Sequence, residues 1–168
     1  LRAGCGIARL AVPSCLTNAV LPYLLETTLC PMPSADGHLA YDEVALRMAF
    51  QGASCGAVGM GMGLYEDNSE ILTWILENLS IPLVIDADGL NTLSSMKDGL
   101  DLLRSTQCKV VLTPHPKEFS RLCNRSVRDI LEDPINHALK FAKDYRCILL
   151  LKGTSTVVTD GNDVIVVT

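Results

Sequence analysis

Four clusters in this 168-residue sequence combine residue types that could bind ligands or move protons. Each cluster directly follows a short apolar run that is typical of a buried strand. The clusters span residues 59–63, 86–91, 113–118 and 152–156. Because ligands bind at the carboxyl ends of parallel strands, we expect the four clusters to meet at one crevice.

Alternating glycines form the first cluster, at Gly59, Gly61 and Gly63. Without a Cβ atom, backbone amides there could approach a phosphate or a flat ring closely. A tight turn from strand to helix is the structural alternative. The spacing is not that of a dinucleotide-binding GxGxxG motif.

Two carboxylates and an amide make up the second cluster, with Asp86, Asp88 and Asn91. Extended backbone would place Asp86 and Asp88 on the same side, where they could bind Mg²⁺, orient hydroxyls or act as a base. The alternative is that Asp88 and Asn91 only cap the next helix.

In the third cluster a histidine and an acid lie three residues apart, at His115 and Glu118. Prolines on both sides of His115 restrict its backbone, which favours a placed ring. Glu118 lies near a predicted helix start, where the helix dipole alone would favour an acid. His38 and His137 have no such setting and are interpreted as surface or packing residues.

Lys152 leaves a buried strand in the fourth cluster, so its ammonium needs a partner. A nucleotide phosphate is one candidate and the Asp86 carboxylate is another. The following residues supply further donors suited to phosphate oxygens. They are Gly153, Thr154, Ser155 and Thr156.

Alternating strand and helix patterns predict an α/β fold with a mostly parallel sheet, helices on both of its faces and a C-terminal β-hairpin. Strands are predicted at 6–12, 57–59, 82–86, 109–113 and 147–151, and the hairpin at 155–159 with 164–167. Helices are predicted near 14–25, 42–52, 68–79, 98–105 and from 134, with another after 116 and a capped segment opening at Ser126. Residues 31–37 read as a loop.

Composition predicts one globular domain over residues 1–168, with 48% hydrophobic and 20% charged residues. A net charge of −5 argues against nucleic-acid and anionic-membrane binding, and no apolar run reaches membrane-spanning length. The seven cysteines show no metal-ligand spacing, which favours reduced thiols and a cytoplasmic location. The first residues, Leu1 to Cys5, lack an initiator methionine, so we expect the chain to start upstream.

Taken in order, the four clusters resemble the ADP- or ATP-dependent NAD(P)H-hydrate dehydratase family of the ribokinase-like superfamily. The segment Thr113 to Glu118, after the Asp-Ala-Asp strand end, is the most specific part of this resemblance. It implies that residues 1–168 are an incomplete, central part of a ribokinase-like domain. It also implies repair of hydrated NADH or NADPH, whose hydroxyl is phosphorylated and then lost as phosphate.

The resemblance also implies roles for individual residues. Gly61 and His115 would contact the hydrated nicotinamide, with Gly63, Asp88 and Asn91 in the same crevice. The nucleotide would lie along Lys152, Gly153, Thr154, Ser155 and Thr156. Glu118 would lie near Mg²⁺ and the phosphates.

The family's catalytic aspartate lies in a Gly-Gly-Ser-Gly-Asp segment expected beyond Thr168. No catalytic residue is therefore assigned within this chain, which alone is expected to be inactive. Family members are often tetramers, and ADP is expected to be preferred over ATP. Two alternatives stay open: a vitamin or sugar kinase of the same fold, and a nucleotide-binding module without catalysis.

Overall fold

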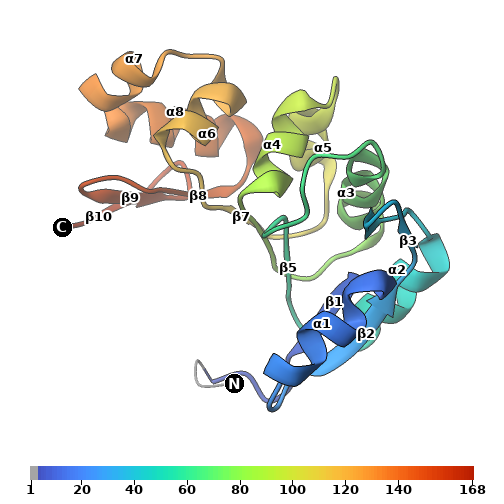
Figure 1. Ribbon diagram of the computed structural model, residues 1–168. Coiled ribbons are helices and arrows are strands. Elements are labelled where there is room, and N and C mark those ends of the chain that lie inside the picture. Colours follow the sequence, from blue (N-terminus) through green and yellow to red (C-terminus); the bar gives the residue numbers. More distant parts are fainter. Residues whose placement is uncertain (1–3) are drawn as a thin grey trace.

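A six-stranded sheet forms the centre of the protein in the computed structural model, which describes residues 4–168 (Figure 1). The strand order is β10-β9-β8-β7-β6-β5. In chain order, the first four strands of this sheet are β5 (Gly56–Val58), β6 (Leu83–Ile85), β7 (Val110–Leu112) and β8 (Ile148–Leu151). These four pair in parallel, so their carboxyl ends share one edge of the sheet.

The predicted C-terminal hairpin is present and extends this sheet. Strand β9 (Thr156–Thr159) pairs antiparallel with β8 on one side and with β10 (Val164–Val167) on the other. The turn between β8 and β9 therefore lies at the same edge as the ends of the parallel strands. Together these observations confirm an α/β fold with a mostly parallel sheet.

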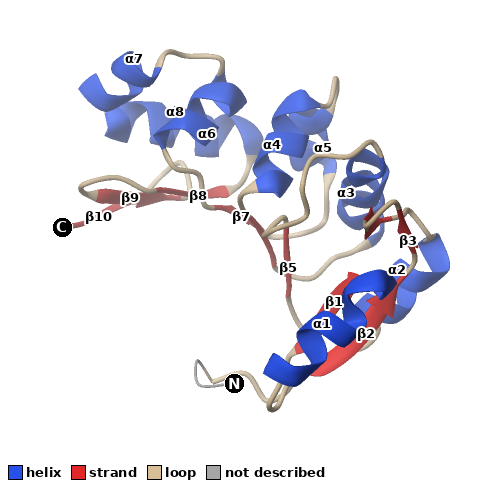
Figure 2. Ribbon diagram, in the orientation of Figure 1, coloured by secondary structure: helices blue, strands red, loops and turns tan. Residues whose placement is uncertain are grey.

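The helices that follow β5 form a layer on one face of the sheet (Figures 1 and 2). They are α3 (Asp67–Asn78), α4 (Asp88–Ser95), α5 (Gly99–Ser105), α6 (Pro116–Cys123), α7 (Val127–Glu132) and α8 (Pro134–Tyr145). On the opposite face, the strand residues Val84, Val111 and Leu150 are only half-buried. Among residues 4–168, the helices that cover the sheet thus lie on one face, whereas helices were expected on both faces.

The core lies between this helix layer and the sheet. Helix α3 contributes Ile71, Leu72, Ile75 and Leu76, whose helical spacing places all four on its buried side. From the sheet, Leu83, Ile85, Leu112 and Leu149 are completely buried. Alternation along each strand explains why one side chain enters the core while its neighbour faces away.

Helix α4 is the main element that sequence reasoning missed. Residues 88–91 were expected to close the strand 82–86, with Asp88 and Asn91 either in the site or capping the next helix, and that helix was expected near residue 98. Instead α4 begins at Asp88, immediately after Ala87, whose φ of 48° and ψ of −116° turn the chain sharply. A non-glycine residue rarely adopts such a conformation, so propensity did not indicate the turn.

Caps explain where the later helices begin. The Ser126 hydroxyl accepts a hydrogen bond from Asp129 N at 3.1 Å, as the sequence suggested, and starts α7. The Asp133 carboxylate caps α8, with Pro134 at its first position. Both α6 and α8 end at residues with positive φ, Asn124 and Arg146.

The N-terminal elements form a separate small layer. Its strands are β1 (Arg9–Pro13), β2 (Thr28–Met32), β3 (Ser34–Ala35) and β4 (His38–Leu39), and its helices are α1 (Thr17–Val20) and α2 (Glu43–Phe50). Short 3₁₀ turns at Ser14–Leu16 and Leu21–Tyr23 flank α1. Strands β1 and β2 pair in parallel as a two-stranded sheet.

Two sequence predictions for this layer were wrong in detail. The predicted strand 6–12 starts later, at Arg9, and it includes Pro13. The predicted loop 31–37 contains the end of β2 and the whole of β3. Proline is tolerated in β1 and β2 because an edge strand can lose a ladder hydrogen bond without leaving a buried gap.

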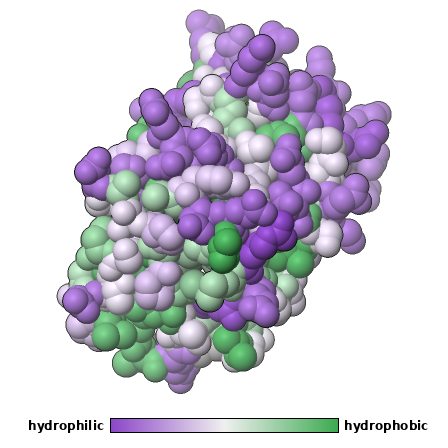
Figure 3. Space-filling view, turned by 90° about the vertical axis from the view of Figure 1, so that its right-hand side faces the viewer, coloured by the Kyte–Doolittle hydropathy of each residue, from purple (hydrophilic) through white to green (hydrophobic). Residues whose placement is uncertain are grey.

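The N-terminal layer leaves much apolar surface exposed. Ile7, Tyr23 and Leu25 are 79%, 83% and 95% exposed. Figure 3 shows hydrophobic residues gathered in the lower part of the molecule, the height at which the N-terminal elements lie in Figure 1. In the part of the chain that is described, no helix combines the length and apolar character that a membrane crossing requires.

Candidate functional site

The carboxyl ends of β5 and β6 are in direct backbone contact through two glycines. Gly59 has φ of 111°, and a Cβ on it would overlap the Asp86 carbonyl oxygen and lie 2.5 Å from Gly89 N. Asp88 N donates to Gly59 O at 3.1 Å. A Cβ on Gly89 would in turn lie only 3.0 Å from Gly59 Cα and 3.1 Å from Val58 O, so glycine at both positions allows the first two clusters to touch.

Asp88 joins the glycine loop to helix α4. Its carboxylate oxygen Oδ2 accepts a hydrogen bond from Gly63 N at 2.8 Å. As the first residue of α4, Asp88 also lies where the helix dipole favours a negative charge. Gly61, between the two contacts, has φ of 72° and no atom within 4 Å of a Cβ position, so it is open to solvent.

The glycine loop has further support that sequence reasoning missed. Asn68, 1% exposed, donates from Nδ2 to Gly63 O at 2.8 Å. The Tyr65 ring packs on Gly63 and stacks on His38 with 4.0 Å between ring centroids. His38 is therefore a packing residue, as expected, and its Nε2 lies 3.5 Å from Asp67 Oδ2.

Asp86 and Lys152 meet across strand β7. Lys152 Nζ donates to Asp86 Oδ1 at 3.0 Å, although 66 residues separate them in the sequence. Lys152 N also donates to Pro114 O at 2.9 Å, which ties the end of β8 to the residue before His115. The Asp86 carboxylate, one of the two partners that the sequence suggested for Lys152, is in contact with it.

The surroundings of Asp86 favour its ionised form. Burial acts to raise the pKa of this carboxyl, but hydrogen bonds from Lys152 and the Ala87 amide together hold it below its ordinary value. Asp86 is thus a carboxylate at neutral pH, with Lys152 as its counter-ion.

We expect the free energy of unfolding to depend on the ionisation of Asp86. Since its pKa is lowered in the folded protein, the stabilisation is present above the ordinary carboxyl pKa and is lost as the pH falls through the lowered value. Urea unfolding between about pH 6 and about pH 3 should show a smaller loss of stability for Asp86→Asn than for the unchanged protein. Parallel curves for the two proteins would contradict this.

His115 and Glu118 form a reciprocal cap at the start of α6. His115 Nδ1 accepts from Lys117 N at 3.1 Å and from Glu118 N at 3.3 Å, while His115 N donates to Glu118 Oε2 at 2.8 Å. The cap assigns the ring proton to Nε2, which lies 3.4 Å from Glu118 Oε1. The ring edge is accessible, because the His115 side chain is 46% exposed.

Glu118 is mostly buried, with a side chain only 8% exposed. Within residues 4–168 no three His, Cys, Asp or Glu side chains form a group that could hold a metal ion by themselves. Mg²⁺ is commonly held by one or two carboxylates together with substrate phosphates. The residues present fit that mode of binding, and they do not fit a metal site made of protein ligands alone.

The remaining predicted residues lie at the same edge. Asn91 of α4 accepts on Oδ1 from Arg121 Nη1 of α6 at 2.7 Å, which links the two helices. Residues 153–155 form the exposed turn between β8 and β9, and Thr156 begins β9. The hydrogen bonds between strand ends thus bring all four sequence clusters together.

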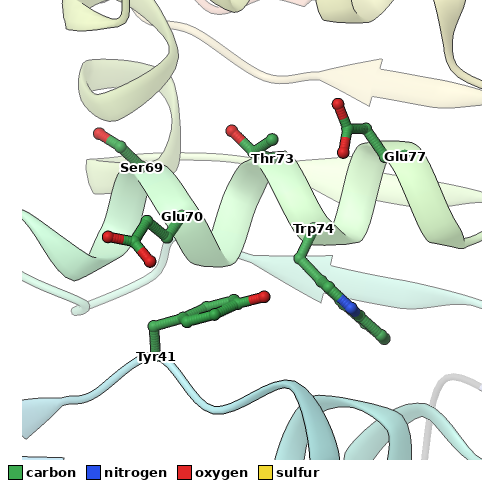
Figure 4. Close-up of a pocket in the computed structure, with 6 residues that line it drawn as sticks. All are labelled: Tyr41, Ser69, Glu70, Thr73, Trp74 and Glu77. Atoms are coloured by element: carbon green, nitrogen blue, oxygen red, sulfur yellow. The ribbon is translucent and has the colours of Figure 1, made fainter.

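Two surface cavities lie elsewhere, between α3 and the N-terminal layer. Figure 4 shows one of them, in which Tyr41 lies below α3 on the side toward which Glu70 and Trp74 point. The other is lined by residues of α2 and α3. Neither is lined by a residue of the four clusters, and neither contains a strand end, so we place the candidate site at the sheet edge.

Comparisons with known proteins identify the family to which this chain is similar. A family model described as NAD(P)H-hydrate dehydratase matches residues 1–168. The bifunctional NAD(P)H-hydrate repair enzyme of Salinibacter ruber is 32% identical over 160 residues, covering 94% of this chain and 29% of that protein. An ADP-dependent (S)-NAD(P)H-hydrate dehydratase of Cenarchaeum symbiosum is 28% identical over 166 residues, covering 96% and 54%.

Solved structures show the same architecture. A ribokinase-like superfamily protein from Enterococcus faecalis matches with a TM-score of 0.78 at 18% identity, over 99% of this chain and 54% of that one. The ADP/ATP-dependent NAD(P)H-hydrate dehydratase of Bacillus subtilis, co-crystallised with ATP and Mg²⁺ and soaked with CoA, matches with 0.73 at 22%, over 98% and 56%. The fold is therefore ribokinase-like. The chain spans about 30% of the length of the bifunctional relatives.

Proposed function

Because this chain belongs to the NAD(P)H-hydrate dehydratase family, we propose that the protein dehydrates hydrated NADH and NADPH with ADP or ATP as co-substrate. One observation carries the proposal: hydrogen bonds at the carboxyl edge link Gly63 to Asp88 and Asp86 to Lys152. This linkage supports the proposal that a site for a flat ring lies beside a site for phosphates.

Hydroxide is a poor leaving group and phosphate a good one, which gives the nucleotide its purpose in the proposed reaction. The terminal phosphoryl group moves to the hydroxyl of the hydrated ring, whose proton is released, and AMP or ADP leaves as the anhydride bond breaks. Phosphate then departs with that oxygen, and loss of a ring proton restores the double bond. Charge develops on the phosphoryl oxygens during transfer, where a placed cation is most effective.

Each half of the site has a role in this proposal. Gly61 lies in open space in the glycine loop and allows the nicotinamide ring to approach the backbone. The partly exposed side chain of His115 would donate from Nε2–H to the same ligand. Lys152 and the turn of Gly153, Thr154 and Ser155, with Thr156, bind the nucleotide phosphates.

Mg²⁺ belongs to the same proposal. It would be held chiefly by phosphate oxygens, with Glu118, which caps α6 beside His115, as the carboxylate, and it would neutralise charge during phosphoryl transfer. The Bacillus subtilis relative was co-crystallised with ATP and Mg²⁺. We assign no catalytic base among residues 4–168. ADP as the preferred nucleotide and a reducing cytoplasmic setting remain predictions.

The experiment that tests the function uses the whole protein. Hydrated NADH is incubated with ADP or ATP and Mg²⁺, and the return of nicotinamide absorbance is followed. Recovery of NADH that requires the nucleotide is the expected result. If a vitamin or sugar alcohol is phosphorylated while the hydrate is untouched, the protein is a kinase of the same fold. Binding of ADP without any turnover would identify a nucleotide-binding module.

Gly61→Ala is expected to impair hydrate binding without unfolding the protein. The added methyl group enters open space, so the stability cost is only about 1 kcal/mol, from the positive φ. The same methyl group would stand where the ring approaches, and KM for the hydrate should rise about tenfold.

Gly52→Ala is the matched control for that change. Gly52 has the same φ of 72° and equally open surroundings, but it lies after α2, away from the strand ends. The Gly52→Ala protein should lose a similar free energy of unfolding and keep its KM for the hydrate. Equal KM values for the two variants would remove Gly61 from the site.

Assembly is a further prediction. The resemblance implies a tetramer, and the exposed apolar side chains of the N-terminal layer are consistent with a surface that another copy covers. Light scattering on the purified protein measures the mass directly, and a monomer at every accessible concentration would contradict the prediction.

A further inference from the structure

Asp86 occupies a position that connects the two halves of the proposed site, although the family resemblance implied no binding role for it. It ends β6, and the Asp86 Oδ1 atom accepts two hydrogen bonds, from Lys152 Nζ at 3.0 Å and from Ala87 N at 2.8 Å. The first bond reaches the end of β8 across β7. The second stays within the turn that opens α4.

The bond to Ala87 supports a strained turn. At φ of 48° and ψ of −116°, Ala87 adopts a conformation that favours glycine, and such strain persists only where surrounding contacts impose it. Asp86 Oδ1 holds the Ala87 amide, and Gly89 N donates to Asp86 O at 3.0 Å. This turn sets the direction of Asp88, whose carboxylate holds Gly63 N.

The bond to Lys152 differs from an ordinary surface ion pair. Its partners come from two strands separated by a third, and the Asp86 side chain is only 28% exposed. Backbone also fixes the Lys152 end, since Lys152 N donates to Pro114 O. A long, flexible lysine side chain is thereby held in one direction, which reduces the entropy lost when it must stabilise a transferring phosphoryl group.

We propose that Asp86 is a positioning residue, whose carboxylate aims the Lys152 ammonium at the nucleotide phosphates and at the same time fixes the turn that presents Asp88 and Gly63 to the substrate. This inference rests on the proposed function, because it assigns the phosphates to Lys152. Asp86 touches neither ligand in it. Its negative charge beside the phosphate site opposes nucleotide binding slightly, so orientation and affinity should respond in opposite directions.

The test is Asp86→Asn in the whole protein, which keeps the size of the side chain and removes its charge. We expect kcat for hydrate dehydration to fall about tenfold to a hundredfold, because the ammonium is no longer aimed. The dissociation constant for ADP, measured by calorimetry, should stay the same or fall about threefold, as expected for release of a partly exposed ion pair. A parallel loss of kcat and ADP affinity would indicate a structural defect and overturn the proposal.

A double-mutant cycle with Lys152→Met isolates the pair. In the Lys152→Met background, Asp86→Asn should change neither kcat nor ADP affinity by more than about twofold, because the ammonium that Asp86 positions is gone and the asparagine Oδ1 can still accept from Ala87 N at the turn. Independent losses that simply add would overturn the proposal. Asp101→Asn is the control, since Asp101 forms an exposed ion pair with Arg104, outside the four clusters, and should leave both quantities unchanged.

Asp86→Glu keeps the charge and moves the carboxylate by one methylene, and it serves if the asparagine variant does not fold. It should bind ADP normally and lose kcat, whereas a normal kcat would overturn the proposal. Failure of the proposed function gives a different result: the unchanged protein binds ADP but leaves the hydrate untouched. Even then the calorimetric cycle tests whether Asp86 acts on ADP through Lys152.

Discussion

Replacing Lys152 with methionine is expected to lower kcat/KM for the nucleotide about a hundredfold, the usual effect of removing one well-placed charged donor from a developing anion. Methionine keeps most of the length of the apolar stem and removes only the ammonium. The ADP dissociation constant should rise in calorimetry, while binding of the hydrate, followed separately, should stay near its original value.

The same substitution is expected to have little effect on folding. The Lys152 and Asp86 side chains are 41% and 28% exposed, so breaking their ion pair should change the free energy of unfolding by about 1 kcal/mol or less. Lys140→Met is the matched control, because Lys140 is an exposed lysine on α8 outside the four clusters. An unchanged ADP affinity in Lys152→Met would show that the nucleotide phosphates do not bind at this edge of the sheet.

Gly59→Ala has the largest expected effect on stability. The new Cβ would overlap the Asp86 carbonyl oxygen, and its neighbours there are backbone atoms that cannot rotate away. Together with the strain of φ at 111°, this overlap should cost about 3 kcal/mol or more. Urea unfolding should show a large fall in the midpoint, and any folded protein should have lost the contact between the first two clusters.

Gly37→Ala separates the two causes of that loss. Gly37 has φ of 87°, also in the left-handed region, but no atom lies within 4 Å of its Cβ position. It should therefore lose only about 1 kcal/mol. If Gly59→Ala were no more destabilising than Gly37→Ala, the ends of β5 and β6 could not be in the close contact described.

Much of the site could be recognised before its geometry was known. Apolar runs of three to five residues, each followed by chemically useful side chains, indicated strand ends in a parallel sheet, and the structure confirms that arrangement. The prolines around His115 and the acid at residue 118 indicated a helix start, which the capping box confirms. The binding roles of these residues stay predictions.

Other features had only weak signals in the sequence. Helix α4 was missed because it begins within the motif, at a turn that alanine rarely forms. The partners of the motif residues were also missed: Tyr65 and Asn68 hold the glycine loop, and Arg121 holds Asn91. A buried polar residue such as Asn68, inside an otherwise apolar helix face, was the one available hint.

By itself the sequence determined most strands and helices from β5 onward, although not α4, together with the four clusters at strand ends and the family, because these depend on residue types and on short spacings along the chain. Only the tertiary structure decided that Asp86 pairs with Lys152 and Asp88 with Gly63. Those contacts follow from which strand lies beside which, and from a strained turn at Ala87 that local preference opposes. Contacts between residues 25 or 66 positions apart are set by packing of the whole sheet, which no local pattern records.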